Sequence, residues 1–308
     1  MDSKILGLHH ITAIAGSAKR NYDFYTNVLG LRLVKKTVNF DDPGTYHFYF
    51  GDEVGSPGSI LTFFPWESVS PGSQGSGQAT EVVYAVPRNS LDFWKKRLEE
   101  SFVHVTGSGK RFGEDFLSFK DPDGLPITLI EPSTSDDRKG WQTTEVSAEV
   151  AIKGFHSVTL SLNHKGATQH VLELLGYSLA AEEQNRYRFV TDTIATAGIV
   201  DILEVKEPRG HNAAGTIHHV AFRVKDEAVQ AAIREKIVKA GYQITPKIDR
   251  NYFFSLYFRE PGGVLFEIAT DNPGFAVDES INELGTHLML PAQYESSRKR
   301  IEEVLPVL

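Results

Sequence analysis

The order of apolar and polar positions repeats four times along the chain. Each repeat opens with a stretch typical of a β-strand, continues with a segment whose apolar residues recur at helical spacing, and ends with two or three further strands. In the last repeat, Val229, Ile233 and Ile237 mark the buried face of the predicted helix. The repeats cover about residues 6–66, 78–131, 152–205 and 216–270. In the first of them, the later strands are predicted at Thr45–Phe50 and Ile60–Phe64.

Two of the repeats end in nearly the same turn. Residues 119–124 (FKDPDG) resemble residues 258–263 (FREPGG), in which proline and glycine supply a tight turn between strands. Superposing the two turns puts Thr128 at the position of Glu267 and Glu81 at that of His219. One of two equivalent sites would then have lost its polar ligands.

The stretch from Pro132 to Val150 is polar and lacks periodicity, which is typical of a linker. It divides the chain into an N-terminal half, residues 1–140, and a C-terminal half, residues 150–308, with two repeats each. After Pro291 the pattern predicts a terminal helix whose apolar side chains pack back on the protein.

Composition limits the classes of partner. The chain of 308 residues has a net charge of −8 and no basic run, which argues against nucleic acid. No apolar stretch approaches the roughly 20 residues of a membrane span, and the N-terminus shows no signal-peptide pattern, so we expect no membrane partner and a cytoplasmic location. There is no cysteine, so any metal must be held by nitrogen and oxygen.

Two similar strands each carry a pair of histidines. They read Leu8-His9-His10-Ile11-Thr12 and Ile217-His218-His219-Val220, and Glu267 lies in a third, apolar strand. A buried carboxylate is costly without a cation or hydrogen-bond donors. Two histidines and one carboxylate make a facial site that leaves positions open for O2 and substrate on Fe(II).

Only one histidine of each pair can face such a site, because side chains alternate along a strand. The alternation predicts one shared face for Leu8, His10 and Thr12, and one for Ile217, His219 and Ala221. We therefore expect His10 and His219 to be the ligands and His9 and His218 to lie at the rim. For any single histidine a structural role is the better interpretation; for two matched pairs it is not.

The modules and these motifs, in this order, resemble the vicinal oxygen chelate superfamily. That group includes glyoxalase I, extradiol dioxygenases and the fosfomycin and bleomycin resistance proteins. The third module has Ser157 where catechol extradiol dioxygenases carry a ligand, so the site must combine His10 with His219 and Glu267. This distribution resembles the hydroquinone ring-cleavage dioxygenases.

The resemblance implies an α+β fold of four βαβββ modules, with mixed curved sheets that form barrel-like cavities. It also implies an Fe(II)-dependent dioxygenase that opens para-dihydroxy aromatics with O2 to hydroxymuconic semialdehyde-type products. Mn(II) stays open as the metal, and so does the choice between catabolism and quinone detoxification. A small aromatic substrate and O2 are the expected partners, and homo-oligomers are common among such proteins.

The resemblance further implies roles around the metal. Tyr257 would hydrogen-bond the ligated oxygen or protonate a departing one, Arg250 would stabilise an oxyanion, and His9 or His218 would accept a phenolic proton. The remaining position of this set is Thr12. Without the resemblance, Tyr257 is equally well a strand aromatic and Arg250 a loop salt bridge.

Other histidines are predicted to lie outside the site. His47, His104 and His170 are expected to be structural or on the surface, and His211 and His287 to lie in loops without binding metal. Two rival functions remain. One is a glyoxalase-like metal-dependent isomerase, which commonly needs a fourth protein ligand. The other is a protein that sequesters a quinone or a drug without catalysis.

Overall fold

The computed structural model describes residues 4–308, so the first three residues of the predicted N-terminal half lie outside the described residues. The first two modules comprise β1 (Leu8–Ala15), α1 (Ala18–Asp23), β2 (Arg32–Asn39), β3 (Asp42–Gly51) and β4 (Ile60–Pro65), then β5 (Gln78–Ala85), α2 (Leu91–Glu100), β6 (Val105–Arg111), β7 (Glu114–Lys120) and β8 (Pro126–Ile130). The last two comprise β9 (Gly154–Leu162), α3 (Gly166–Leu174), β10 (Ser178–Glu183), β11 (Arg186–Val190) and β12 (Ile199–Glu204), then β13 (Thr216–Val224), α4 (Glu227–Lys239), β14 (Ile248–Asp249), β15 (Phe253–Arg259) and β16 (Leu265–Pro273). The prediction of four βαβββ modules in an α+β fold is confirmed.

Strand β2 was not predicted. Its sequence, RLVKKTVN, places two lysines in the middle of the strand and so breaks the apolar pattern. Lys35 is nevertheless fully buried, because its ammonium group reaches the carboxylates of Asp278 and Glu279 at 2.5 and 2.6 Å.

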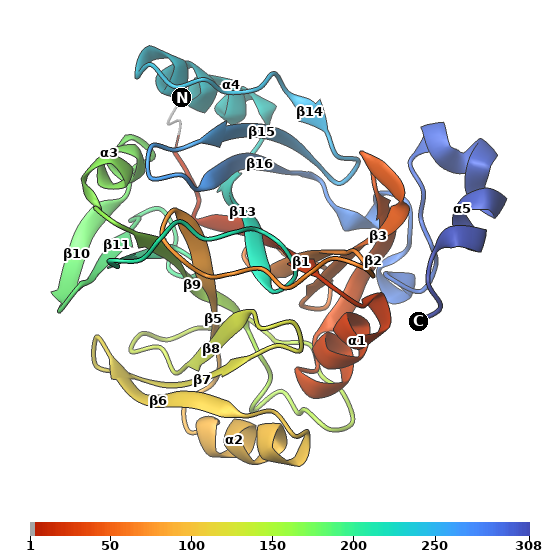
Figure 1. Cartoon of the computed structure of the whole chain (residues 1–308), viewed down its shortest axis with the longest axis horizontal. Coiled ribbons are helices and arrows are strands. Elements are labelled where there is room, and N and C mark those ends of the chain that lie inside the picture. Colours follow the sequence, from red (N-terminus) through yellow and green to blue (C-terminus); the bar gives the residue numbers. More distant parts are fainter. Residues whose placement is uncertain (1–3) are drawn as a thin grey trace.

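The strands form two curved sheets of eight strands each (Figure 1). One sheet has the order β14-β15-β16-β13-β1-β4-β3-β2, and the other has the order β10-β11-β12-β9-β5-β8-β7-β6. The central pairs, β1 with β13 and β5 with β9, are antiparallel. Each sheet therefore joins one module from each half of the chain, and module 1 lies beside module 4.

An irregularity interrupts each of the two strands that carry a histidine pair. Leu8 lies opposite Phe222 and His10 opposite Ala221, so His9 is an extra, unpaired residue in β1. His218 is the extra residue in β13, because Thr12 lies opposite His219 and Ala13 opposite Ile217. Such β-bulges reverse the alternation of side chains at one point.

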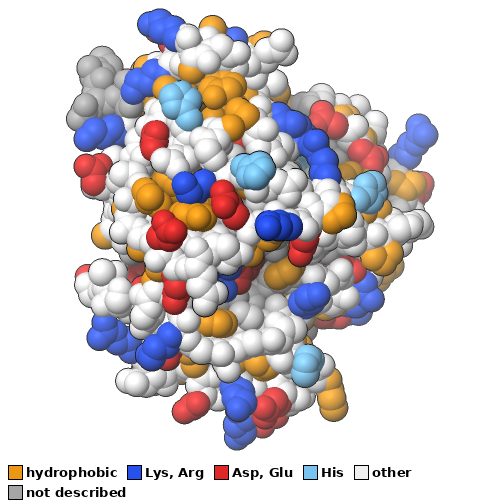
Figure 2. Space-filling model, turned by 60° about the vertical axis from the view of Figure 1, so that its left-hand side comes forward, with side chains coloured by type: hydrophobic (Ala, Val, Ile, Leu, Met, Phe, Trp, Pro, Cys, Tyr) orange, Lys and Arg blue, Asp and Glu red, His pale blue; other side chains and the backbone are white. Residues whose placement is uncertain are grey.

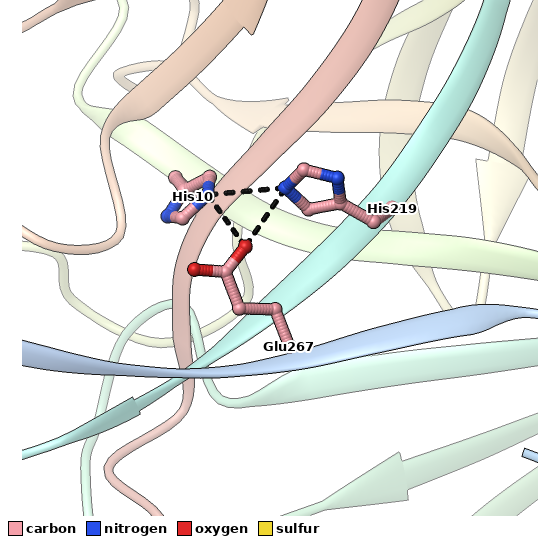
Figure 3. Close-up of side chains that lie close together, drawn as sticks. All are labelled: His10, His219 and Glu267. Carbon is pink, nitrogen blue, oxygen red and sulfur yellow. Dashed lines mark hydrogen bonds and ion pairs between the residues drawn. The ribbon is translucent and has the colours of Figure 1, made fainter. Parts of the chain in front are cut away.

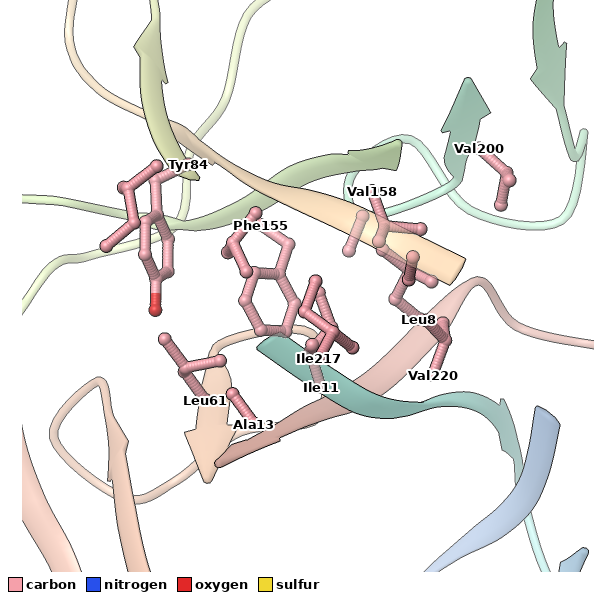
Figure 4. Close-up of a cluster of buried hydrophobic side chains, with 14 of the residues drawn as sticks. Leu8, Ile11, Ala13, Leu61, Tyr84, Phe155, Val158, Val200, Ile217 and Val220 are labelled. Carbon is pink, nitrogen blue, oxygen red and sulfur yellow. The ribbon is translucent and has the colours of Figure 1, made fainter. Parts of the chain in front are cut away.

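The bulges move Leu8 and Ile217 to the face opposite His10 and His219, so the predicted shared faces were wrong at these two positions. Both side chains lie in the main hydrophobic core with Ile11 and Val220 (Figure 4). In the same view Phe155 of β9 packs against this group, which shows that the core joins the two sheets.

The C-terminal segment packs against β2 and β3 of the first sheet. After β16 a short 3-10 turn (Phe275–Val277) leads to Asp278, which accepts a hydrogen bond from Tyr252. The helix α5 (Arg298–Val304) is preceded by a 3-10 turn (Ala292–Ser297), and Ile301 packs on Val38 of β2. The predicted terminal helix is confirmed, although it is shorter than expected.

The surface mixes charges of both signs. On the face in Figure 2, Lys and Arg side chains alternate with Asp and Glu among uncharged groups. Within residues 4–308, no helix has the length and apolar character needed to span a lipid bilayer.

Replacing Lys35 by methionine tests the buried ion pairs. We expect Lys35→Met to lower the free energy of unfolding by about 3 kcal/mol, because two carboxylates lose their buried cation. Lys19→Met removes an exposed partner of Asp23 and should change stability little. Urea unfolding of both variants measures the difference, and equal effects would contradict a structural role for Lys35.

Candidate metal centre

Three neighbouring strands bring His10, His219 and Glu267 together. The His10 Nε2 atom lies 3.3 Å from His219 Nε2 and 3.2 Å from Glu267 Oε2, and His219 Nε2 lies 2.8 Å from the same oxygen (Figure 3). All three side chains are buried, and Glu267 is 0% exposed. In the described part of the chain, they are the only group of three or more His, Asp or Glu side chains found with this geometry.

The carboxylate of Glu267 shows why a cation fits here. Its Oε1 atom accepts a hydrogen bond from Ser255, whereas Oε2 has no hydrogen-bond partner. The short contacts from Oε2 to the two imidazoles thus lack hydrogen-bond geometry. The two Nε2 atoms and Oε2 all lie within 4.8 Å of one another, which is an arrangement that could hold a metal ion.

The two histidines of each pair are hydrogen-bonded to each other through their Nδ1 atoms. His9 Nδ1 lies 2.9 Å from His10 Nδ1, and His218 Nδ1 lies 2.8 Å from His219 Nδ1. If His10 and His219 bind a metal through Nε2, the Nδ1 atom of each carries the proton and donates it to the preceding imidazole. Partners of this kind fix the tautomer and the orientation of a ligand.

Burial keeps the two supporting histidines neutral. It lowers the pKa of His9 well below its ordinary value, and the neighbouring His10 lowers it further. Burial and the adjacent His219 lower the pKa of His218 to about 3. A neutral imidazole can accept the proton that its partner offers.

The predicted rim position is wrong for His9. Its side chain is 2% exposed and lies against Phe253, because the bulge turns it beside His10. His218 is half-buried and lines a cavity of about 240 Å³ in front of the ligand cluster.

This cavity collects most of the predicted site residues. Thr12, Arg250 and Tyr257 line it together with His10, His218 and His219, and the lining also includes the aromatic side chains of Phe64, Trp66 and Phe253. His9 lies behind this wall. His211 and His287, which were expected to lie in loops, are not among the residues that line this cavity.

Arg250 and Tyr257 form a polar side of the cavity. The Arg250 Nε atom donates to Tyr257 Oη at 3.3 Å, and its Nη1 lies 3.4 Å from Asp41 Oδ2. Burial raises the pKa of Tyr257, and the Glu267 charge adds to this, so the phenol stays protonated. The pKa of Arg250 is raised despite its burial by its contacts with Tyr257 and Asp41, so the guanidinium stays charged.

His47, which the sequence indicated as a structural or surface residue, lines the cavity. It lines the same cavity as His10 and His219, and its two nitrogens contact Thr62 Oγ1 at 2.8 Å and Tyr49 Oη at 2.9 Å. The signal was present in β3, where His47 and Tyr49 alternate with the core residues Phe48 and Phe50.

The second sheet contains the expected relic of this site. Glu81 lies opposite Thr159 in the register that His219 has with Thr12. Its carboxylate binds Arg111 at 3.0 Å and accepts hydrogen bonds from Thr128 and Thr159. A salt-bridged carboxylate thus occupies the position equivalent to His219, in agreement with the superposition of the two turns.

Comparison with known proteins identifies the family. The family model described as Glyoxalase/Bleomycin resistance protein/Dioxygenase superfamily matches residues 7–129 and 153–268, and the chain belongs to that superfamily.

Several relatives span the whole chain. MhqO of Bacillus subtilis (strain 168), provisionally named a ring-cleaving dioxygenase, is 46% identical over 308 residues, which cover 99% of this chain and 97% of that protein. The chlorohydroquinone/hydroquinone 1,2-dioxygenase of Sphingobium indicum is 35% identical over 98% of this chain and 96% of that protein. A crystal structure of a B. subtilis protein, provisionally described as a dioxygenase, superposes with a TM-score of 0.95 at 45% identity and covers 99% of this chain and 98% of that one.

Metal binding should depend on the converging donors. We expect one divalent ion per chain to stabilise the protein by about 2.7 kcal/mol at a hundredfold excess over its dissociation constant. Glu267→Ala and His219→Ala should abolish this gain, and His9→Phe should weaken affinity by about 10- to 100-fold. Thermal unfolding over a series of metal concentrations measures both the stabilisation and the affinity. The exposed His104→Ala is the control, and a full gain in Glu267→Ala would refute the site.

Acid should destabilise the metal-free protein through its buried histidines. The folded-state pKa of His218 is about 3 and its ordinary value is 6.5, so between these values the unfolded chain binds the extra proton. The free energy of unfolding should therefore fall as the pH is lowered from 7 to 5. His218→Gln should reduce this fall, as measured by urea unfolding at both pH values; an unchanged fall would contradict the assignment.

Proposed function

We propose that this protein is an Fe(II)-dependent ring-cleaving dioxygenase that acts on hydroquinone-type aromatics. The observation that carries the proposal is the set of three converging donors from β1, β13 and β16 at one side of an aromatic-lined cavity. A cavity of about 240 Å³ is smaller than the roughly 300–1,000 Å³ of sites for drug-sized ligands, which favours a single substituted ring. The hydroquinone dioxygenase activity in the name of the S. indicum relative supports the substrate class.

The residues fit the metal that this class requires. His10, His219 and Glu267 would hold Fe(II), which when bound supplies open positions for a substrate oxygen and O2 and a path for electrons between them. Mn(II) accepts the same nitrogen and oxygen donors and is the second candidate for this site.

The protein side chains orient the ring and manage its protons. Phe64, Trp66 and Phe253 provide apolar surface that excludes water from the substrate ring. Arg250 presents a fixed positive charge where an oxyanion develops. Tyr257 keeps its proton and can donate it to an oxygen of the substrate or product, while neutral His218 can accept one.

The expected product is a ring-opened hydroxymuconic semialdehyde type of compound that contains both oxygen atoms of O2. The cytoplasmic location and homo-oligomeric assembly stay predictions from the sequence. So does the division of the sequence into halves at residues 132–150.

The two rival functions have less support. A glyoxalase-like isomerase would be expected to show a fourth ligand, whereas the cluster in the described residues has three members. A protein that only sequesters a quinone would have no use for three converging donors buried beside its cavity.

Oxygen uptake tests the function. After anaerobic loading with Fe(II), we expect methylhydroquinone to trigger consumption of one O2 per ring and the rise of an ultraviolet-visible band of the opened product. His10→Ala, His219→Ala and Glu267→Ala should lose this activity. Metal binding without O2 uptake on any hydroquinone or catechol would refute the proposal.

The hydroxyl group of Tyr257 should matter for the chemical step. We expect Tyr257→Phe to lower kcat by about 100-fold and to leave KM within a few-fold, because the proton donor acts during the reaction. The matched control is Tyr46→Phe. Tyr46 lies on β3 but does not line the cavity, so this change should leave kcat and KM unaltered. Equal kinetics of the two variants would show that Tyr257 serves only to fill the wall.

A further inference from the structure

Four side chains in and behind the cavity wall form a continuous hydrogen-bonded chain that the proposed function does not yet use. Thr12 Oγ1 lies 3.0 Å from Thr62 Oγ1, Thr62 Oγ1 lies 2.8 Å from His47 Nε2, and His47 Nδ1 lies 2.9 Å from Tyr49 Oη. Thr12, His47 and Tyr49 line the cavity, whereas Thr62 lies behind it and is 0% exposed. The two ends of the chain thus meet the same cavity.

The sheet fixes this chain rigidly. Thr62 on β4 lies opposite Thr12 on β1 and opposite Tyr49 on β3, with His47 two residues farther along β3. Thr12 also lies opposite the candidate ligand His219. The Thr12 end is therefore beside the ligand cluster, and the Tyr49 end is two strands away in the sheet order.

Each member of the chain can donate one proton and accept another, so the chain has two directions. In the first, Tyr49 donates to His47 Nδ1, Nε2–H donates to Thr62, and Thr12 presents its proton to the cavity. In the second, every bond is reversed and Tyr49 presents its proton. Burial lowers the pKa of His47 well below its ordinary value, with His10 and His219 adding to the effect, so the imidazole is neutral in both directions.

A para-dihydroxy ring creates a need for such a chain. In an ortho-dihydroxy ring both oxygens can reach one metal ion, which promotes loss of both protons. In a para-dihydroxy ring the second hydroxyl lies at the opposite end of the ring, beyond reach of the ion that holds the first. The protein must then take the far proton, if electrons are to leave the ring for O2.

We propose that Tyr49, His47, Thr62 and Thr12 form a proton relay for the far hydroxyl of a para-dihydroxy substrate. The inference rests on the proposed function and specifies how its site selects this substrate class. Tyr49 and Thr12 are the catalytic ends, and His47 and Thr62 are positioning residues that act through them.

The relay balances the reaction. The O–H bond of the far hydroxyl breaks, and its proton forms a new O–H bond at Tyr49 as each proton moves one place along. Thr12 gives its own proton to an oxygen of the product. The ring is oxidised, O2 is reduced and both of its atoms enter the product, so hydroquinone plus O2 gives the opened product without net uptake of protons.

The tautomer of His47 provides a test that does not need turnover. The protein is labelled with 15N-histidine, loaded with Zn²⁺ and kept anaerobic, and the His47 signals are assigned by their loss in His47→Gln. The far hydroxyl of methylhydroquinone can donate its proton to Tyr49, so His47 should be in the Nε2–H tautomer when this compound is bound. In 4-methoxyphenol the far oxygen only accepts, so Tyr49 should turn towards it and the imidazole proton should shift to Nδ1. The same tautomer with both compounds would overturn the relay.

Variants of Thr62 separate the relay from a structural role. Thr62→Val keeps the shape but breaks the chain, whereas Thr62→Ser keeps the hydroxyl. In the Fe(II) protein we expect Thr62→Val to lower kcat for methylhydroquinone by about 100-fold with KM and metal content unchanged, and Thr62→Ser to restore most of it. The ligand-dependent shift of His47 should disappear in Thr62→Val and persist in Thr62→Ser.

The tautomer measurement and the kinetic comparison together distinguish failure of the relay from failure of the proposed function. If the unmodified protein consumes no O2 but His47 changes tautomer as described, ring cleavage is wrong and the relay stands as a feature of hydroquinone binding. If the unmodified protein is active and Thr62→Val matches it, ring cleavage stands and the relay is wrong.

Discussion

The antiparallel pairing of β1 with β13, with one extra residue in each strand, positions the two histidine pairs of the candidate metal centre. Because His9 and His218 are the extra residues, the adjacent imidazoles of each pair lie on nearly the same side of the strand, with their Nδ1 atoms 2.9 and 2.8 Å apart. A regular strand would have sent the first histidine of each pair to the opposite face. The bulges therefore place beside each candidate ligand a histidine that contacts it from the preceding position in the chain.

The same irregularity connects the site to the core. Leu8 and Ile217 precede the bulges and pack between the sheets, whereas His10 and His219 follow them and face the cavity. The candidate ligands thus lie on strands whose other face is close-packed, where a displacement would disturb large apolar side chains. Rigidity of this kind keeps the Nε2 atoms converging before any metal arrives.

Much of the architecture follows from the sequence, since the repeated turn at residues 119–124 and 258–263 and the helical spacing in α4 reveal the modules. The pairing of modules 1 and 4 was inferred from the positions of His10 and Ser157. The bulges could not be found, because an extra residue leaves the apolar pattern of Ile11 and Ala13 intact. The strand β2 and the position of His47 were not predicted for a related reason. In a sequence, a polar residue indicates an exposed position, and the partners that allow Lys35 and His47 to be buried are known only from the structure.

The sheet that carries the site is built from the first and last modules, and the consequence concerns when the site can exist. His10 and His219 are 209 residues apart in sequence, and Glu267 comes later still. Contacts between such distant residues form late in folding, because the entropy cost of closing a long loop precedes the stabilisation that the contacts provide. A growing chain that has folded only its first two modules has one of the three ligands. The complete set of three candidate ligands therefore exists only after the last module has folded, when the residues that line the cavity are also in place.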